Sequence, residues 1–135
     1  MNYTYSICHT DEFEIEYPKE KLNESDVIKL FKEYPWQKKL TEMNNAEAFY
    51  NPSLDFKNIA NEKSLGISGH LENNEVKFSL WYKRPIKTKP FFGLFGTKEK
   101  MKVIDKWNFD KNKALEYLEV FLNKNYSKME RLMNE

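Results

Sequence analysis

The sequence predicts a single α+β domain, in which an antiparallel β-sheet of about five to six strands carries its helices on one face. Several short stretches alternate between apolar and polar residues, and this period of two predicts strands. Two other regions repeat apolar residues every three or four positions, as amphipathic helices do. The length of 135 residues, with 40% hydrophobic and 16% aromatic residues, suits one core. We therefore expect one domain over residues 1–135.

The first two predicted strands cover residues 3–8 and 12–17, where apolar and polar residues alternate. Residues 9–11 are long enough only for a tight connection between them, and Pro18 ends the second strand. One face of this second strand carries a row of carboxylates, Glu12, Glu14 and Glu16. Such a row suits a solvated edge strand, and it also offers a negatively charged contact surface.

A pair of helices is predicted next. Asn23 is a favourable N-cap residue, and Asp26 complements the positive N-terminal end of a helix. Apolar residues at helical spacing follow over residues 27–34. Pro35 then interrupts the helix, and a second helical piece is expected from Trp36 to about Met43.

The clearest strand signal is a hairpin. Residues 64–71 and 76–83 alternate, and Asn73-Asn74 between them suit a two-residue turn because asparagine tolerates positive φ. This turn places Leu71 opposite Val76 on the same side of the sheet. A shorter strand is expected at residues 54–57, and another over residues 100–108, with Met101, Val103 and Trp107 on one face.

The C-terminal region predicts one long helix. Asp110 is a suitable N-cap, and residues from Lys111 to about Met133 contain neither glycine nor proline. Their apolar residues recur mostly at steps of three and four, which predicts a stripe packed on the sheet.

Composition excludes several classes of protein. The single cysteine, Cys8, rules out an intramolecular disulfide, and the first residues lack the pattern of a signal peptide. No apolar run approaches the roughly 20 residues that span a bilayer. We therefore expect a cytoplasmic protein without a membrane span. The oligomeric state stays open.

The charge is uneven although its total is only +1. Residues 1–33 carry eight acidic residues and four lysines, whereas residues 77–106 carry nine basic residues and two acidic ones. Trp81 and Lys83 share one strand face with Lys77 and Ser79 within the basic region. Aromatic and basic residues together can stack and bind a nucleic-acid strand, which is one alternative function. The near absence of arginine disfavours that alternative.

Candidate catalytic residues are few. Cys8 and His9 are adjacent, so in a strand they point to opposite faces, and no second metal ligand lies at a suitable spacing from His70. None of the four glycines fits a phosphate-binding loop. We therefore expect no enzyme, cofactor or metal. The remaining alternative is a small enzyme or ligand-binding domain with a pocket in which His70 meets a carboxylate.

The stretch PFFGLFG at residues 90–96 raises a separate question. It gathers Phe91, Phe92, Leu94 and Phe95 between lysines, with prolines and glycines that suit an ordered loop. The loop could cap the core, anchor a protein partner or insert shallowly into a membrane. The candidate partner-binding residues are these four together with Trp81, Lys83, Arg84, Lys87, Glu12, Glu14 and Glu16.

In its overall character the chain resembles the immunity proteins of bacterial toxin–immunity systems. The stretches SLWYKRP and WNFDKNKALEYLEVFL align loosely with such proteins, which are small, single-domain α+β proteins. The resemblance implies a non-catalytic protein that neutralises a cognate toxin by covering its active or binding surface. A basic toxin would meet residues 11–16, and the basic face with the loop over residues 85–98 is the other expected contact.

Overall fold

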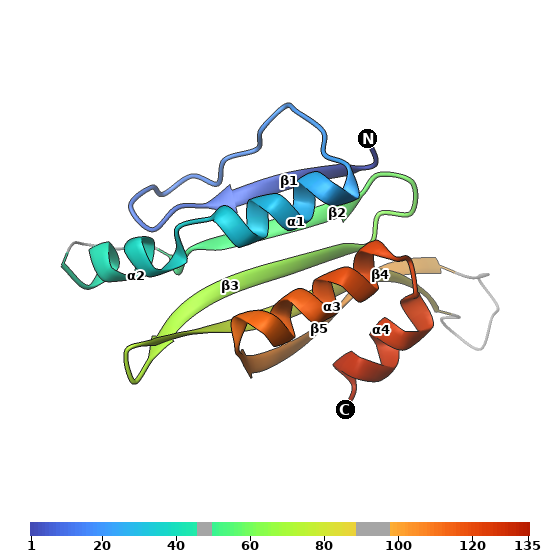
Figure 1. The fold of residues 1–135 in the computed structure, drawn as a ribbon. Coiled ribbons are helices and arrows are strands. Elements are labelled where there is room, and N and C mark those ends of the chain that lie inside the picture. Colours follow the sequence, from blue (N-terminus) through green and yellow to red (C-terminus); the bar gives the residue numbers. More distant parts are fainter. Residues whose placement is uncertain (46–49, 89–97) are drawn as a thin grey trace.

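Five antiparallel strands in chain order form the sheet of this protein. The computed structural model describes residues 1–45, 50–88 and 98–135. Each strand pairs with its neighbours in the sequence, so the sheet is a meander with β1 and β5 at its edges (Figure 1). The strands are β1 (Tyr3–Cys8), β2 (Ser53–Asn58), β3 (Ser64–Glu72), β4 (Glu75–Thr88) and β5 (Lys98–Phe109).

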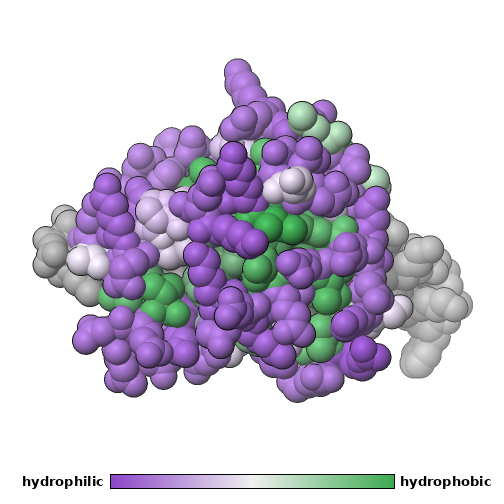
Figure 2. Space-filling view, in the orientation of Figure 1, coloured by the Kyte–Doolittle hydropathy of each residue, from purple (hydrophilic) through white to green (hydrophobic). Residues whose placement is uncertain are grey.

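Four helices in the described part of the chain cover one face of this sheet (Figure 1). They are α1 (Glu24–Glu33), α2 (Trp36–Asn45), α3 (Lys111–Leu122) and α4 (Tyr126–Met133). The predicted α+β class and the antiparallel sheet are therefore confirmed. Figure 2 views this helix-covered side: the outer helix surfaces are hydrophilic, and apolar residues reach the surface between them.

The core lies between the sheet and the helices because alternate strand residues face one side. One row of directly opposed residues crosses four strands on that side, and all are buried: Tyr5, Phe56, Leu65 and Tyr82. Phe31 of α1 and Phe121 of α3 pack against these strands and are fully buried. Burying each such side chain stabilises the fold by roughly 1.5–3 kcal/mol.

The first helical pair agrees with the sequence prediction. The side chain of Asn23 accepts a hydrogen bond from the backbone N–H of Asp26 at 2.8 Å, and the Asp26 carboxylate accepts one from the Asn23 N–H at 3.2 Å. This reciprocal capping box fixes the start of α1. Pro35 separates the two helices, and α2 extends to Asn45, two residues beyond the predicted end.

The predicted hairpin is confirmed in its turn and in its register. Asn73 and Asn74 have φ values of 53° and 66°, as a two-residue turn of this type requires. Leu71 lies opposite Val76. The strand predicted at residues 100–108 is confirmed as part of β5, and Asp110 caps α3 by accepting from the Lys113 N–H at 2.7 Å.

Residues 12–17 do not form the predicted second strand. In the described part of the chain, one isolated bridge, Ile7↔Glu16, joins this segment to β1, and a second, Tyr3↔Leu22, follows it along the chain. The bridges are four residues apart in β1 but six apart in the returning segment, so the extra residues bulge out and no continuous ladder forms. Glu12, Glu14 and Glu16 therefore lie in an exposed, irregular segment rather than along a strand.

The predicted long C-terminal helix is also wrong, because it is two short helices. Helix α3 ends at Leu122, Lys124 adopts a φ of 60°, and Asn125 caps α4 by accepting from the Lys128 N–H at 3.3 Å. The break turns α4 back toward the sheet, where Met129 and Met133 are buried. An unbroken helix would carry these two methionines away from the core.

Candidate binding site on the open face of the sheet

The face of the sheet opposite the helices is polar and carries a hollow at its centre. Two adjacent rows of directly opposed residues cross it. The first row is Ser6, Asp55, Gly66, Trp81 and Asp105, and the second is Thr4, Lys57, Ser64, Lys83 and Val103. Side chains alternate between the two faces of a sheet, so these residues alternate along each strand with the residues that form the buried core.

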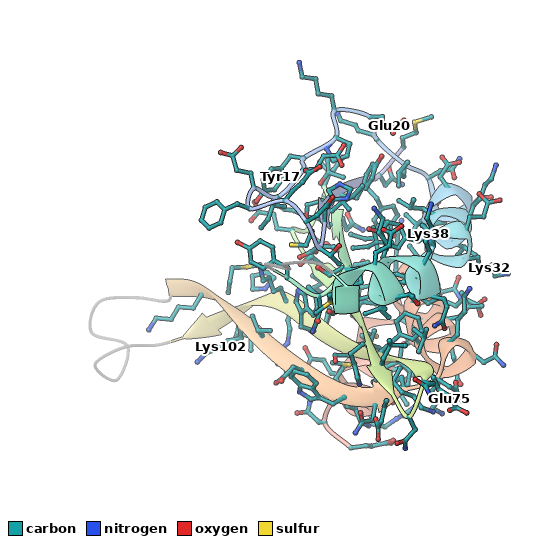
Figure 3. The ribbon with its side chains drawn as sticks, turned by 90° about the vertical axis from the view of Figure 1, so that its left-hand side faces the viewer. Tyr17, Glu20, Lys32, Lys38, Glu75 and Lys102 are labelled. Atoms are coloured by element: carbon teal, nitrogen blue, oxygen red, sulfur yellow. The ribbon has the colours of Figure 1, made fainter. Side chains whose placement is uncertain are left out.

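The hollow has a volume of about 770 Å³. The returning N-terminal segment supplies one side through Ile15, Tyr17 and Pro18, and β5 supplies another through Met101 and Val103. Figure 3 shows Tyr17 on the side of the sheet opposite Lys32 of α1, so this segment overhangs the open face. The volume lies within the range of roughly 300–1,000 Å³ that is typical of small-molecule sites.

Trp81 lies across the backbone of Gly66. A Cβ atom added to Gly66 would lie 1.8 Å from indole atom Cε2 and 2.2 Å from both Cζ2 and Nε1. Cε2 is bonded to both Cζ2 and Nε1. A Cβ position directly under Cε2, on one side of the ring plane, would therefore be about equally far from these two atoms, as is found. One ring face therefore covers Gly66, and the other faces the hollow that Trp81 lines. Only glycine leaves room for this arrangement.

Asp55 is the most perturbed carboxyl group of the hollow. Burial raises the pKa of Asp55, while Lys83, the Trp81 indole N–H, the Ser64 hydroxyl and Lys57 act in the opposite direction. In the described part of the chain the two lysines act through space, because neither forms a direct ion pair with this carboxylate. A carboxylate has about four acceptor positions, so Asp55 retains capacity for a ligand donor.

A second surface feature lies on the edge strand β5 and overlaps the hollow at Met101 and Val103. Met101, Val103 and Trp107 are 49%, 52% and 63% exposed, and the Trp107 indole N–H donates to Asp105 at 2.7 Å. We call these three residues the β5 stripe. Lys100 and Lys102 alternate with the stripe and are exposed. The stripe is therefore a largely apolar surface on the open face, interrupted by Asp105, while the two lysines extend from the other face of β5.

The predicted partner-binding residues fall into four groups. Trp81 and Lys83 line the hollow. Arg84 lies on the opposite face, where its side chain is only 10% exposed and its Nε donates to Glu130 at 2.6 Å. Phe91, Phe92, Leu94, Phe95 and the side chain of Lys87 lie outside the described residues. Glu12, Glu14 and Glu16 are exposed in the overhanging segment.

The two histidines lie apart from the hollow. His70 Nε2 is 3.9 Å from Glu72 Oε2, a loose contact in an exposed part of the hairpin. His9 is closer to a carboxylate, with Nε2 2.6 Å from Glu16 Oε2, and neither histidine lines the hollow. Among the described residues, no group of three histidine, cysteine or acidic side chains could hold a metal ion.

Sequence reasoning missed Asp55 and Gly66, although a signal for Gly66 was present. The Asn73-Asn74 turn fixes the hairpin register, and that register places Gly66 opposite Trp81. A glycine facing a large aromatic residue across a strand pair indicates close approach of the ring to the backbone. Asp55 gave no such signal, because its burial depends on the overhanging segment.

Comparison with protein-family models, with curated proteins and with solved structures finds no match for this chain. Over residues 1–45, 50–88 and 98–135, no helix has the length and apolar character needed to cross a membrane. Function is therefore inferred from the geometry of the open face and of β5.

Proposed function

We propose that this protein is a non-catalytic binding module that docks a protein partner along β5, as the immunity proteins that it resembles would dock a toxin. The observation that carries the proposal is the β5 stripe. Three large apolar side chains on one exposed strand form the kind of cluster that marks protein interfaces, in which tryptophan is a frequent hot spot.

The position of β5 at the sheet edge supports the same proposal. β5 pairs only with β4, and no backbone hydrogen bond to another segment is found for it in the described part of the chain. Free backbone groups on an edge strand can receive an extended segment of a partner as a further strand. The stripe would then supply contacts for alternate side chains of that segment.

The charge of β5 indicates which kind of partner segment fits it. Lys100 and Lys102 extend from β5 on the face opposite the stripe, and like charges along this edge strand discourage its pairing with a second copy. An acidic or neutral extended segment fits better than a basic one. Phe92 and Phe95, predicted as anchors, belong to the connection between β4 and β5 in the sequence.

The test compares two substitutions at exposed apolar residues. Trp107→Asp changes the stripe, whereas Ile59→Asp changes a residue that is 43% exposed and lies outside it. A partner captured by the wild type is purified, and its affinity for each folded variant is measured by calorimetry. We expect Trp107→Asp to weaken binding by about 30-fold, the equivalent of a hot spot of about 2 kcal/mol. Equal affinities for both variants would contradict docking at the stripe.

The toxin-neutralising role is tested separately with the same captured partner. We expect that partner to arrest growth when a host expresses it alone, and growth to return when this chain is co-expressed. Co-expression of Trp107→Asp should restore growth less well. A harmless partner would refute the immunity role while leaving the docking proposal to the affinity measurement.

A further inference from the structure

The hollow on the open face has a chemistry that docking along β5 does not use. Its charged lining residues are Asp55, Glu62, Lys57 and Lys83, so two negative and two positive side chains oppose each other. A guest with a single charge would meet one attractive and one like charge at short range. The lining therefore favours a neutral guest that presents both hydrogen-bond donors and acceptors.

The floor of the hollow favours a flat guest. Trp81 lies over Gly66 with one ring face against the backbone, which holds the indole in place and turns its other face outward. Stacking on an exposed aromatic face is the main way in which proteins hold an unpaired nucleobase. A ring that stacks there also meets the apolar side chains of Ile15, Tyr17 and Val103 on the walls.

Polar side chains line the hollow beside the Trp81 ring. The Asp55 carboxylate accepts a hydrogen bond from the Trp81 indole N–H and retains further acceptor positions. It can therefore also accept a hydrogen bond from an exocyclic amine or a ring N–H of a guest. Lys83 and Lys57 supply donors for ring nitrogens and carbonyl oxygens. Nucleobases carry adjacent donors and acceptors along their edges.

The hydroxyl groups of the hollow suit an attached ribose. Thr4, Ser6, Ser53 and Ser64 all line it, and each hydroxyl can both donate and accept. A free sugar is a weaker fit, because its hydroxyl groups would meet the apolar walls without partners.

We propose that this hollow binds a nucleobase, carried as a free base or a nucleoside, stacked on Trp81 and bound at its edge by Asp55. The proposal does not depend on the docking of a partner at β5, and neither Asp55 nor Trp81 belongs to the β5 stripe.

The experiment titrates adenosine, guanosine, cytidine and uridine into the full-length protein and follows the indole N–H signals by NMR. The Trp81 signal is assigned by its loss in Trp81→Leu. Glucose tests a sugar, and a ten-nucleotide single-stranded DNA tests a base held within a strand. We expect at least one nucleoside to shift the Trp81 signal with saturation at concentrations up to about 5 mM.

Variants place the binding in the hollow. Trp81→Leu should weaken the bound nucleoside by about 5- to 150-fold, the range expected for loss of one stacked base. Asp55→Asn offers an independent variant, and it should change the order of preference among the four nucleosides because it replaces an acceptor by a donor and an acceptor. Ile59→Ala, outside the hollow, should leave the affinity unchanged.

Three results would overturn the proposal. The first is that no nucleoside shifts the Trp81 signal in the folded protein. The second is that a nucleoside binds with the same affinity and preference to wild type, Trp81→Leu and Asp55→Asn, which would place its site elsewhere. The third is that only glucose or only the DNA strand binds, which would exclude a free base or nucleoside as the ligand.

Discussion

Gly66→Ala tests the close approach between Trp81 and the sheet. The added Cβ would lie 1.8 Å from indole Cε2, whereas carbon atoms in contact lie about 3.5–4.0 Å apart, so the ring must move by roughly 2 Å. Forcing an extra methyl group into a packed position destabilises a protein by about 1–3 kcal/mol. Replacing glycine by alanine in a strand returns about 0.5–1 kcal/mol. The net expected loss is about 1 kcal/mol.

A double-mutant cycle isolates this contact from the backbone effect. In a Trp81→Ala background no ring occupies the position, so Gly66→Ala should stabilise the protein by about 0.5–1 kcal/mol. The sign of the Gly66→Ala effect should therefore reverse, and the coupling energy should be about 1–3 kcal/mol. Urea unfolding of the four proteins measures it. An identical effect of Gly66→Ala in both backgrounds would refute the stacked arrangement of Trp81 on Gly66.

Four other substitutions test the electrostatics and the helix break. Burial raises the pKa of Asp55, so its carboxyl group favours folding at low pH and opposes folding as the pH rises. Asp55→Asn should therefore raise the free energy of unfolding at pH 7. In denaturant titrations this gain should vanish below about pH 3.9. Glu130→Leu leaves the Arg84 guanidinium buried and unpaired and should destabilise the protein by about 3 kcal/mol. Arg84→Met leaves a partly exposed Glu130 and should destabilise the protein by about 1–2 kcal/mol. A larger loss for Arg84→Met in thermal unfolding would contradict this order. Lys124→Gly should stabilise by about 0.5–1 kcal/mol, because glycine adopts a φ of 60° without strain, and a lower melting temperature would argue against the left-handed break.

The sequence predicts the fold well where local patterns and chain geometry agree. The hairpin around Asn73-Asn74 combines alternation with a turn that fixes the register, and both were found. The capping box at Asn23 likewise marks a helix start by side chains three residues apart. These features depend on neighbours in the chain, so no knowledge of the tertiary structure is needed to predict them.

Prediction failed where the outcome depends on contacts between distant segments. Residues 12–17 alternate as a strand does, but in the described part of the chain the single bridge Ile7↔Glu16 joins them to β1. The C-terminal stripe continues through Lys124 without glycine or proline, so its spacing does not show the break that buries Met129. The only local signal in the described residues is Asn125, which caps α4.

The candidate site was only partly predictable for the same reason. Trp81 and Lys83 were selected because strand alternation places them together on a polar face. Asp55 comes from β2, and its burial requires both the strand order and the segment around Tyr17. Arg84, one residue from Lys83, was grouped with it by charge, yet the alternation of the strand places it on the other face, paired with Glu130.

One face of the sheet packs the core and the other lines the hollow, and this separation affects how the protein can evolve by substitution. The helix-covered face carries the apolar rows that hold the fold, whereas Thr4, Ser6, Ser53 and Ser64 on the open face contribute little apolar burial. Substitutions at Thr4 and Ser6, the two of these that are not buried, should therefore change what the hollow accepts while leaving folding almost intact. A lineage could exchange one ligand for another through single steps, each of which passes through a stable protein.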